Sequence, residues 1–245
     1  MDQVFLDIYQ AVWKEIFPNV EIMDLEKFKE LYTKDLRLPK KYESVFDHTS
    51  VYALDDYGYK RFITEDEVKQ RNEVDNFMKQ KTEIIDLKDL LNNVGDVATF
   101  RGSRTINSDV VEESDSVYSS SYIFNSAEIR TCQKMVFCHG NKDCEYLAAS
   151  RGNAESTFGI RLFDDGGVSN SFEVHWSGKS SNCYFCSNCF DLRDCMFCFN
   201  IVSKQYCIGN MQFEEAEYKQ LKEKLIKEYF AQIDQLNAFR LLRDL

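Results

Sequence analysis

The segment CYFCSNCFDLRDCMFCFN, residues 183–200, is a six-residue pattern written three times. Each hexad begins with a cysteine and ends with Asn188, Asp194 or Asn200. Asn and Asp tolerate a positive φ and are common where a chain turns. The segment therefore predicts short straight pieces of chain, with a corner at the end of each hexad.

The same spacing extends over residues 108–207, and every sixth residue from Ser108 to Cys198 is small or apolar. The positions halfway between keep this character, with Asn141, Asn153 and Asp165 as exceptions. A helix places apolar residues at a period of 3.6 and a flat strand at a period of 2, so a period of three fits neither. It is typical of a β-solenoid, whose winding chain turns one residue of each short side inward. The predicted structural interior consists of Ser114, Ser120, Ser126, Cys132, Cys138, Cys144, Cys186 and Cys198.

A second row of apolar residues recurs every twelve positions and lies outside this interior. A narrow coil of about 12 residues with one apolar and one polar face explains the row, whereas an 18-residue, three-sided coil, the alternative, scatters it over all sides. Left bare, the row exposes more apolar surface than a soluble protein normally does. We therefore expect the terminal helices of the chain, or a neighbouring subunit, to lie along it. This predicted interaction face consists of Phe124, Val136, Ile160, Phe172, Tyr184, Met196 and Ile208.

The chain on either side of the repeat is predicted to be mainly helical. Apolar spacing predicts helices over 4–17 and from Asp24 to before Pro39, and a capping box at Thr64 and Glu67 begins another that extends to Met78. A further helix is expected from Asp86 to Gly95, and residues 44–63 are expected to be extended or irregular. The predicted class is α+β, with a helical region at 1–104, a β-solenoid at 105–210 and a long amphipathic C-terminal helix at 211–245.

Charge and composition limit the kinds of partner. The net charge of −11 argues against binding nucleic acid or an anionic membrane, which needs clustered Lys and Arg. The start, MDQVFLDIYQ, lacks the basic region of a signal peptide, and no apolar run approaches the roughly 20 residues that span a bilayer. We therefore expect synthesis in the cytoplasm, other structural proteins as partners, and possible self-association.

The cysteines suggest a metal site by spacing alone. Cys183, Cys186, Cys195 and Cys198 form two Cys-x-x-Cys pairs, a spacing found in zinc sites. Four zinc ligands must converge to about 2.3 Å from one ion. The same hexad register also occurs where the chain has no cysteine, so the register explains the spacing without a metal. We predict interior thiols and no cofactor, with zinc binding or disulfides across a coil as alternatives.

Histidines decide whether the chain resembles a hexapeptide-repeat enzyme. Such solenoids include many acyltransferases, whose sites depend on histidine, and the three histidines here are His48, His139 and His175. The last two share a column, but two or three coils at ~4.8 Å separate them, so they cannot share a metal within one chain. We predict a non-enzymatic protein with no catalytic residue. The alternative is an acyltransferase-like enzyme with His139 or His175 as its base.

The segment CMFCFNIVSKQYCIGNMQFEEAEYKQL, residues 195–221, resembles a signature of uncharacterised Cys-x-x-Cys hexad-repeat proteins from tailed phages and uncultured bacteria. The resemblance covers a fifth to two fifths of the chain and does not extend to the N-terminal helical region. The resemblance implies no enzymatic activity. It implies a phage or viral origin and a structural role, which here means a minor component of a phage head or tail, incorporated into the virion. The matching residues are Cys195, Cys198, Lys204, Tyr206, Cys207, Ile208, Asn210, Glu215 and Tyr218.

Overall fold

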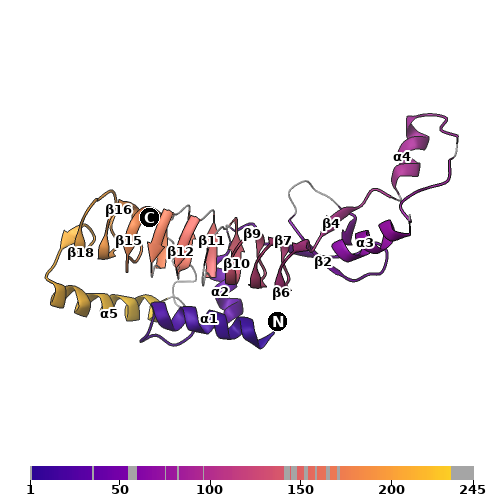
Figure 1. Cartoon of the computed structure of the whole chain (residues 1–245). Coiled ribbons are helices and arrows are strands. Elements are labelled where there is room, and N and C mark those ends of the chain that lie inside the picture. The colour runs from indigo at the N-terminus through magenta and orange to yellow at the C-terminus, as the bar shows by residue number, and fades with distance from the viewer. Residues whose placement is uncertain are drawn as a thin grey trace.

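A computed structural model gives the fold of the protein. It describes residues 2–34, 36–54, 60–74, 76–81, 83–95, 97–140, 144, 148–151, 154–157, 159–163, 166–169 and 172–232. A β-solenoid forms the body of the molecule, helices line one of its sides, and a smaller α/β unit with a projecting helix extends from one end (Figure 1).

The solenoid has the predicted coil length. Strand pairs are parallel and offset by 12 residues, as where Ile123 pairs with Met135 and Cys195 with Cys207. The 18-residue alternative is therefore wrong. The strands are β5 (Thr105–Ile106), β6 (Asp109–Glu112), β7 (Asp115–Tyr118), β8 (Ser121–Phe124), β9 (Ala127–Arg130), β10 (Gln133–His139), β11 (Ala148–Arg151), β12 (Ala154–Thr157), β13 (Ile160–Phe163), β14 (Gly166–Ser169), β15 (Phe172–Ser181), β16 (Ser187–Phe190), β17 (Arg193–Met196) and β18 (Gln205–Ile208), with β19 (Met211–Gln212) antiparallel to β18.

The bends of the coil differ from the prediction. A positive φ recurs at every third residue over 107–137 and 182–206, twice as often as a corner per hexad requires. The bend predicted at Asn200 is present, with positive φ. Asn188 and Asp194 also have positive φ but lie within β16 and β17, and other bends fall at Phe185, Asp191 and Phe197. One left-handed residue in three turns the chain before each inward position. This local geometry produces the period of three.

Three helices cover one side of the solenoid. They are α1 (Gln3–Ile16), α2 (Leu25–Tyr32) and α5 (Glu215–Gln232), and Figure 1 shows α1 and α5 along the same side of the coils. The carboxylates of Asp2 and Asp24 cap α1 and α2 by accepting from backbone N–H groups, which fixes where these helices begin. Helices α1 and α2 and the C-terminal helix are present as predicted. The last begins at Glu215 and not at residue 211, because Met211 and Gln212 pair with β18, and residues 233–245 lie outside the described part of the chain.

Short strands close the N-terminal end of the solenoid. A hairpin of β1 (Lys40–Glu43) and β2 (Ser50–Ala53) packs beside β3 (Phe62–Thr64) and β4 (Phe100–Gly102), which pair in parallel. Ser103 donates its backbone N–H to the Tyr52 carbonyl at 2.6 Å. A Cβ on Gly102 would lie 2.5 Å from Val51 Cγ1, so glycine at this position allows β2 to lie close against β4. These strands fall within the part of the chain predicted to be mainly helical.

Two further helices lie between β3 and β4 in the chain. The capping box predicted at Thr64 and Glu67 is present and begins α3 (Glu65–Glu73). The helix ends at the C-cap Val74 and not at Met78, because Val74 and Met78 are exposed and have no surface to pack against. The next helix is α4 (Leu87–Gly95), as predicted. None of the described helices is both long enough and apolar enough to cross a bilayer.

Candidate interaction surface

The predicted interior serines form a hydrogen-bonded ladder. The hydroxyls of Ser114, Ser120 and Ser126 are buried, and each donates to the carbonyl two residues earlier at 2.7–2.8 Å. Each also accepts the backbone N–H twelve residues later, as where Ser126 Oγ accepts from Cys138 N at 2.9 Å. Each hydroxyl thus satisfies a buried backbone N–H of the next coil and gives a second donor to a carbonyl that, at Glu112 and Tyr118, already accepts a backbone N–H.

The interior cysteines occupy the same positions as these serines. The thiols of Cys132, Cys138, Cys186 and Cys198 donate to the carbonyl two residues earlier, at 3.1–3.5 Å. These four side chains and Cys144 are buried, and all nine cysteines are free thiols. Serine and cysteine therefore replace each other along two columns, one through Ser114, Ser126 and Cys138 and the other through Ser120 and Cys132, because both are small and both can donate to the same carbonyl.

The four cysteines considered as zinc ligands lie in two neighbouring coils. Cys183 and Cys198 are each in hydrogen-bond contact with Cys186 and Cys195. Contact with the thiols of Cys183 and Cys198, together with burial, raises the pKa of Cys186 and Cys195 well above the ordinary value. Within the described residues, no group of three or more His, Cys, Asp or Glu side chains is arranged to hold a metal ion. The coil register accounts for the spacing of these thiols.

The candidate histidines are not brought together. Strand register aligns His139 with Arg151, Arg151 with Phe163 and Phe163 with His175. Three coil steps of about 4.8 Å therefore separate the two histidines. His139 Nε2 lies 3.5 Å from a carboxylate oxygen of Glu128, and the side chain of His175 lies outside the described part. The two histidines therefore cannot belong to one catalytic or metal site within a single chain.

The predicted interaction face is covered by the protein's own helices. Of its members, Phe172 has a side chain outside the described part. The other members are all buried in one core with α1, α2 and α5, and they are Phe124, Val136, Ile160, Tyr184, Met196 and Ile208. Of the two covers expected, the structure thus contains the terminal helices. In this conformation the row is not available to another protein.

Aromatic contacts fasten these helices to the coils. The Phe5 ring lies 5.2 Å from that of Phe124, and the Tyr184 hydroxyl donates to the Ile16 carbonyl at 3.0 Å. Phe185 and Phe197 occupy the same bend in successive coils and stack at 4.6 Å with an angle of 2° between their rings. Both have positive φ, which costs roughly 1–2 kcal/mol per residue, and their packing in this layer offsets that cost.

The exposed apolar surface lies instead on α4 and the segment that leads to it. We call residues 76–95 the α4 arm. Figure 1 shows α4 projecting at the end of the molecule opposite α5 and β18. No residue of α4 is buried, and Leu87 is 70% exposed. The stripe of large exposed side chains consists of Ile84, Ile85, Leu87, Leu90, Leu91 and Val94.

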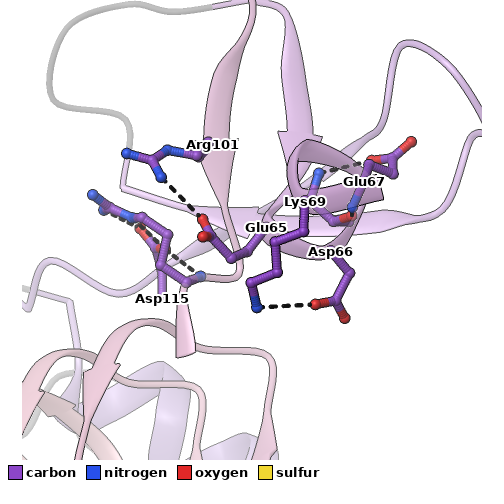
Figure 2. A network of polar contacts seen from close by, with 8 residues as sticks. Glu65, Asp66, Glu67, Lys69, Arg101 and Asp115 are labelled. Atoms are coloured by element: carbon purple, nitrogen blue, oxygen red, sulfur yellow. Dashed lines mark hydrogen bonds and ion pairs between the residues drawn. The ribbon is translucent and has the colours of Figure 1, made fainter. Parts of the chain in front are cut away.

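Ion pairs and hydrogen bonds stabilise the unit from which the arm projects, whereas no side chain of α4 is buried. Glu67 accepts from the Thr64 backbone N–H at 2.7 Å, and Glu65 pairs with Arg101 of β4 at 3.4 Å (Figure 2). Beside this sheet the fully buried Asp115 of β7 accepts two hydrogen bonds from the Arg104 guanidinium, at 2.6 and 3.0 Å. The pair of Glu65 and Arg101 connects α3 to β4, and the pair of Arg104 and Asp115 fixes the chain just after β4 to the first coil. The arm projects from this unit.

No protein-family model, curated protein or solved structure matches this chain.

The sequence predicted α4 as a helix but not its exposure. Leu87, Leu90, Leu91 and Val94 have the i, i+3, i+4, i+7 spacing of an apolar helix face, which in a folded domain usually packs on that domain's core. Three lysines and three acidic residues also leave the arm with no net charge in a chain of net charge −11. This local neutrality was the available signal for a surface that contacts another protein.

Proposed function

We propose that this protein is a non-enzymatic structural protein, a minor component of a virus particle, that binds other structural proteins through the α4 arm. The exposed apolar stripe on α4 carries this proposal. Monomeric proteins rarely leave a contiguous apolar surface of this kind uncovered, and such surfaces mark sites of protein association.

Helix length supports the same conclusion. Helices shorter than about 12–15 residues are marginal in water unless an apolar face is packed. α4 has nine residues and no buried side chain, so it gains little from its own domain. An apolar groove on another structural protein would bury the stripe and stabilise the helix, in the way that amphipathic helices bind grooves elsewhere.

Charge and architecture fit a role as a connecting element. The neutral arm can approach a partner surface without the repulsion expected of the acidic chain as a whole. The solenoid gives a stiff body because its coils bond to one another through parallel strands. Its apolar face is covered by helices, whereas the stripe on α4 is exposed. The resemblance of residues 195–221 to phage proteins supports the assignment to a virus particle.

Particle incorporation tests the proposal. Virus particles purified from cells that produce the protein should contain it in few copies relative to the main shell protein, as measured by quantitative mass spectrometry. The double substitution Leu87→Glu and Leu91→Glu should remove it from particles while the purified variant keeps its unfolding temperature. The matched control, Phe190→Glu and Val202→Glu on exposed solenoid positions, should still be incorporated. Absence of the unmodified protein from particles would reject the proposal.

A further inference from the structure

A cavity lies where the end of α1, the solenoid and α5 meet. Its volume is about 320 Å³, within the size range of small-molecule sites. The side chains of Phe17, Tyr184 and Ile226 give it an apolar lining. Three lysines of α5 also line it, Lys219, Lys222 and Lys227. It is remote from the α4 arm and has no part in the function proposed above.

Lys222 differs from the other lysines of α5. Its Nζ lies 4.1 Å from the centroid of the Tyr184 ring, and the Tyr184 hydroxyl donates to the Ile16 carbonyl, which holds that ring in place. Within the described chain no carboxylate forms an ion pair with Lys222. By contrast Lys219 pairs with Glu215, and Lys224 pairs with Glu228 at 3.8 Å.

Burial makes the charged form of the Lys222 amine less favourable than that of an exposed lysine. Desolvation lowers the pKa of its ammonium group, and the charge of Asp194 opposes this effect only in part. A larger fraction of Lys222 is therefore unprotonated at neutral pH than of an exposed lysine. An unprotonated amine held against an apolar wall is the usual form of a nucleophilic lysine.

We propose that Lys222 is a covalent binding site for a small aldehyde that carries an anionic group. The Nζ lone pair forms a bond to the carbonyl carbon, and the carbonyl oxygen takes up a proton to give a carbinolamine. Loss of water then forms the C=N bond of an imine. Amine and aldehyde give imine and water, so no oxidant or reductant is needed.

The rest of the cavity sets the ligand class. Phe17 and Ile226 offer contact to a flat or aliphatic body, and Lys227 carries an ammonium group for an anionic substituent. Glu15 and Glu223 also line the cavity. Once Lys222 is neutral, Lys219 and Lys227 balance the charges of Glu15 and Glu223. The ammonium group of Lys227, and not a net positive charge of the cavity, is therefore the partner for the anionic substituent.

Chemical labelling tests this site. The full chain is incubated near neutral pH with pyridoxal 5′-phosphate, an aromatic aldehyde with a phosphate group, and the imine is reduced with borohydride to a stable secondary amine. Peptide mass spectrometry should find Lys222 labelled several-fold more than Lys224 of the same helix. As the pH is lowered, labelling of Lys222 should persist to a lower pH than labelling of Lys224.

Two variants separate a specific site from general amine reactivity. Lys222→Arg keeps the positive charge and should abolish the main labelled peptide, whereas Lys224→Arg should leave labelling of Lys222 unchanged. The proposal is overturned if Lys224 is labelled as much as Lys222 in the unmodified protein, or if both lysines share one pH profile. The unmodified chain alone gives this answer, so it does not depend on whether a variant folds.

Discussion

The solenoid and the α4 arm both carry rows of apolar side chains, but only the row on the solenoid is covered. Phe124, Val136 and Met196 lie under three helices of the same chain, whereas Leu87 and Leu91 of α4 face solvent. The covered row contributes to folding because folding removes it from water. The row on α4 keeps its apolar surface exposed after folding, so that surface remains available for association. Four measurements of unfolding test this contrast, from the largest expected change in stability to the smallest.

Truncating a side chain in the covered layer should have the largest effect. Trp13 of α1 is fully buried between the rings of Phe17, Phe28 and Phe230. Trp13→Ala should lower the free energy of unfolding by about 3–5 kcal/mol, measured by urea denaturation. Leu87→Ala on the arm should change it by less than about 0.5 kcal/mol. Equal effects at the two positions would contradict the contrast between the regions.

Of the two ion pairs at the base of the arm, the buried one should contribute more to the free energy of unfolding than the exposed one. Asp115 is fully buried while Arg104 is 37% exposed, so Asp115→Ala leaves a partly solvated guanidinium and should cost about 3 kcal/mol. The pair between Glu65 and Arg101 lies nearer the surface, and Glu65→Ala should cost less than about 1 kcal/mol. Equilibrium unfolding of the two variants measures both values. A smaller loss for Asp115→Ala than for Glu65→Ala would show that the first coil does not depend on its buried pair.

Removing one hydroxyl from the interior ladder should have an intermediate effect. Ser126→Ala removes the hydrogen bond that Ser126 Oγ donates to the Phe124 carbonyl and the one that it accepts from the Cys138 N–H, which should cost about 1–3 kcal/mol. Ser126→Cys keeps a donor to the carbonyl, as Cys138 does one coil later, and should cost less. Thermal unfolding of the pair decides the point. A cysteine variant that is less stable than the alanine variant would argue against equivalent roles for the two residues.

Alkaline pH should weaken the solenoid gradually. Burial raises the pKa of Cys189 and Cys207, so these thiols stay protonated in the folded protein at a pH where they ionise in the unfolded chain. Their contribution is complete below the unfolded pKa near 8.5 and is lost as the pH rises above it. We expect a decline of at most about 1.4 kcal/mol per pH unit for each thiol, measured by urea denaturation between pH 7 and 10.

Substitution identifies the source of this decline. Cys189→Ser combined with Cys207→Ser should reduce the slope, because serine does not ionise in this range, while Cys186 and Cys195 still contribute. An unchanged slope in the double variant would place the effect in other groups.

Much of the solenoid could be predicted from local patterns. The 12-residue coil and the inward residues such as Ser126 and Cys198 follow from spacing, because each coil repeats the environment of the one before it. The bends could not be placed in the same way. Left-handed backbone recurs every three residues and includes Phe185 and Phe197, whose side chains do not favour positive φ and are held by their packing.

The sequence by itself determined the coil length, the small interior residues, and the beginnings of α1, α2 and α3 at Asp2, Asp24 and Thr64, because these depend on neighbours along the chain or on one repeating distance. Only the tertiary structure decided that the outer apolar row lies under the terminal helices, that α3 stops at Glu73, and that α4 has no cover. An apolar helix face has the same sequence pattern whether it packs on its own domain or faces solvent. Its burial depends on which surfaces the rest of the fold brings within reach.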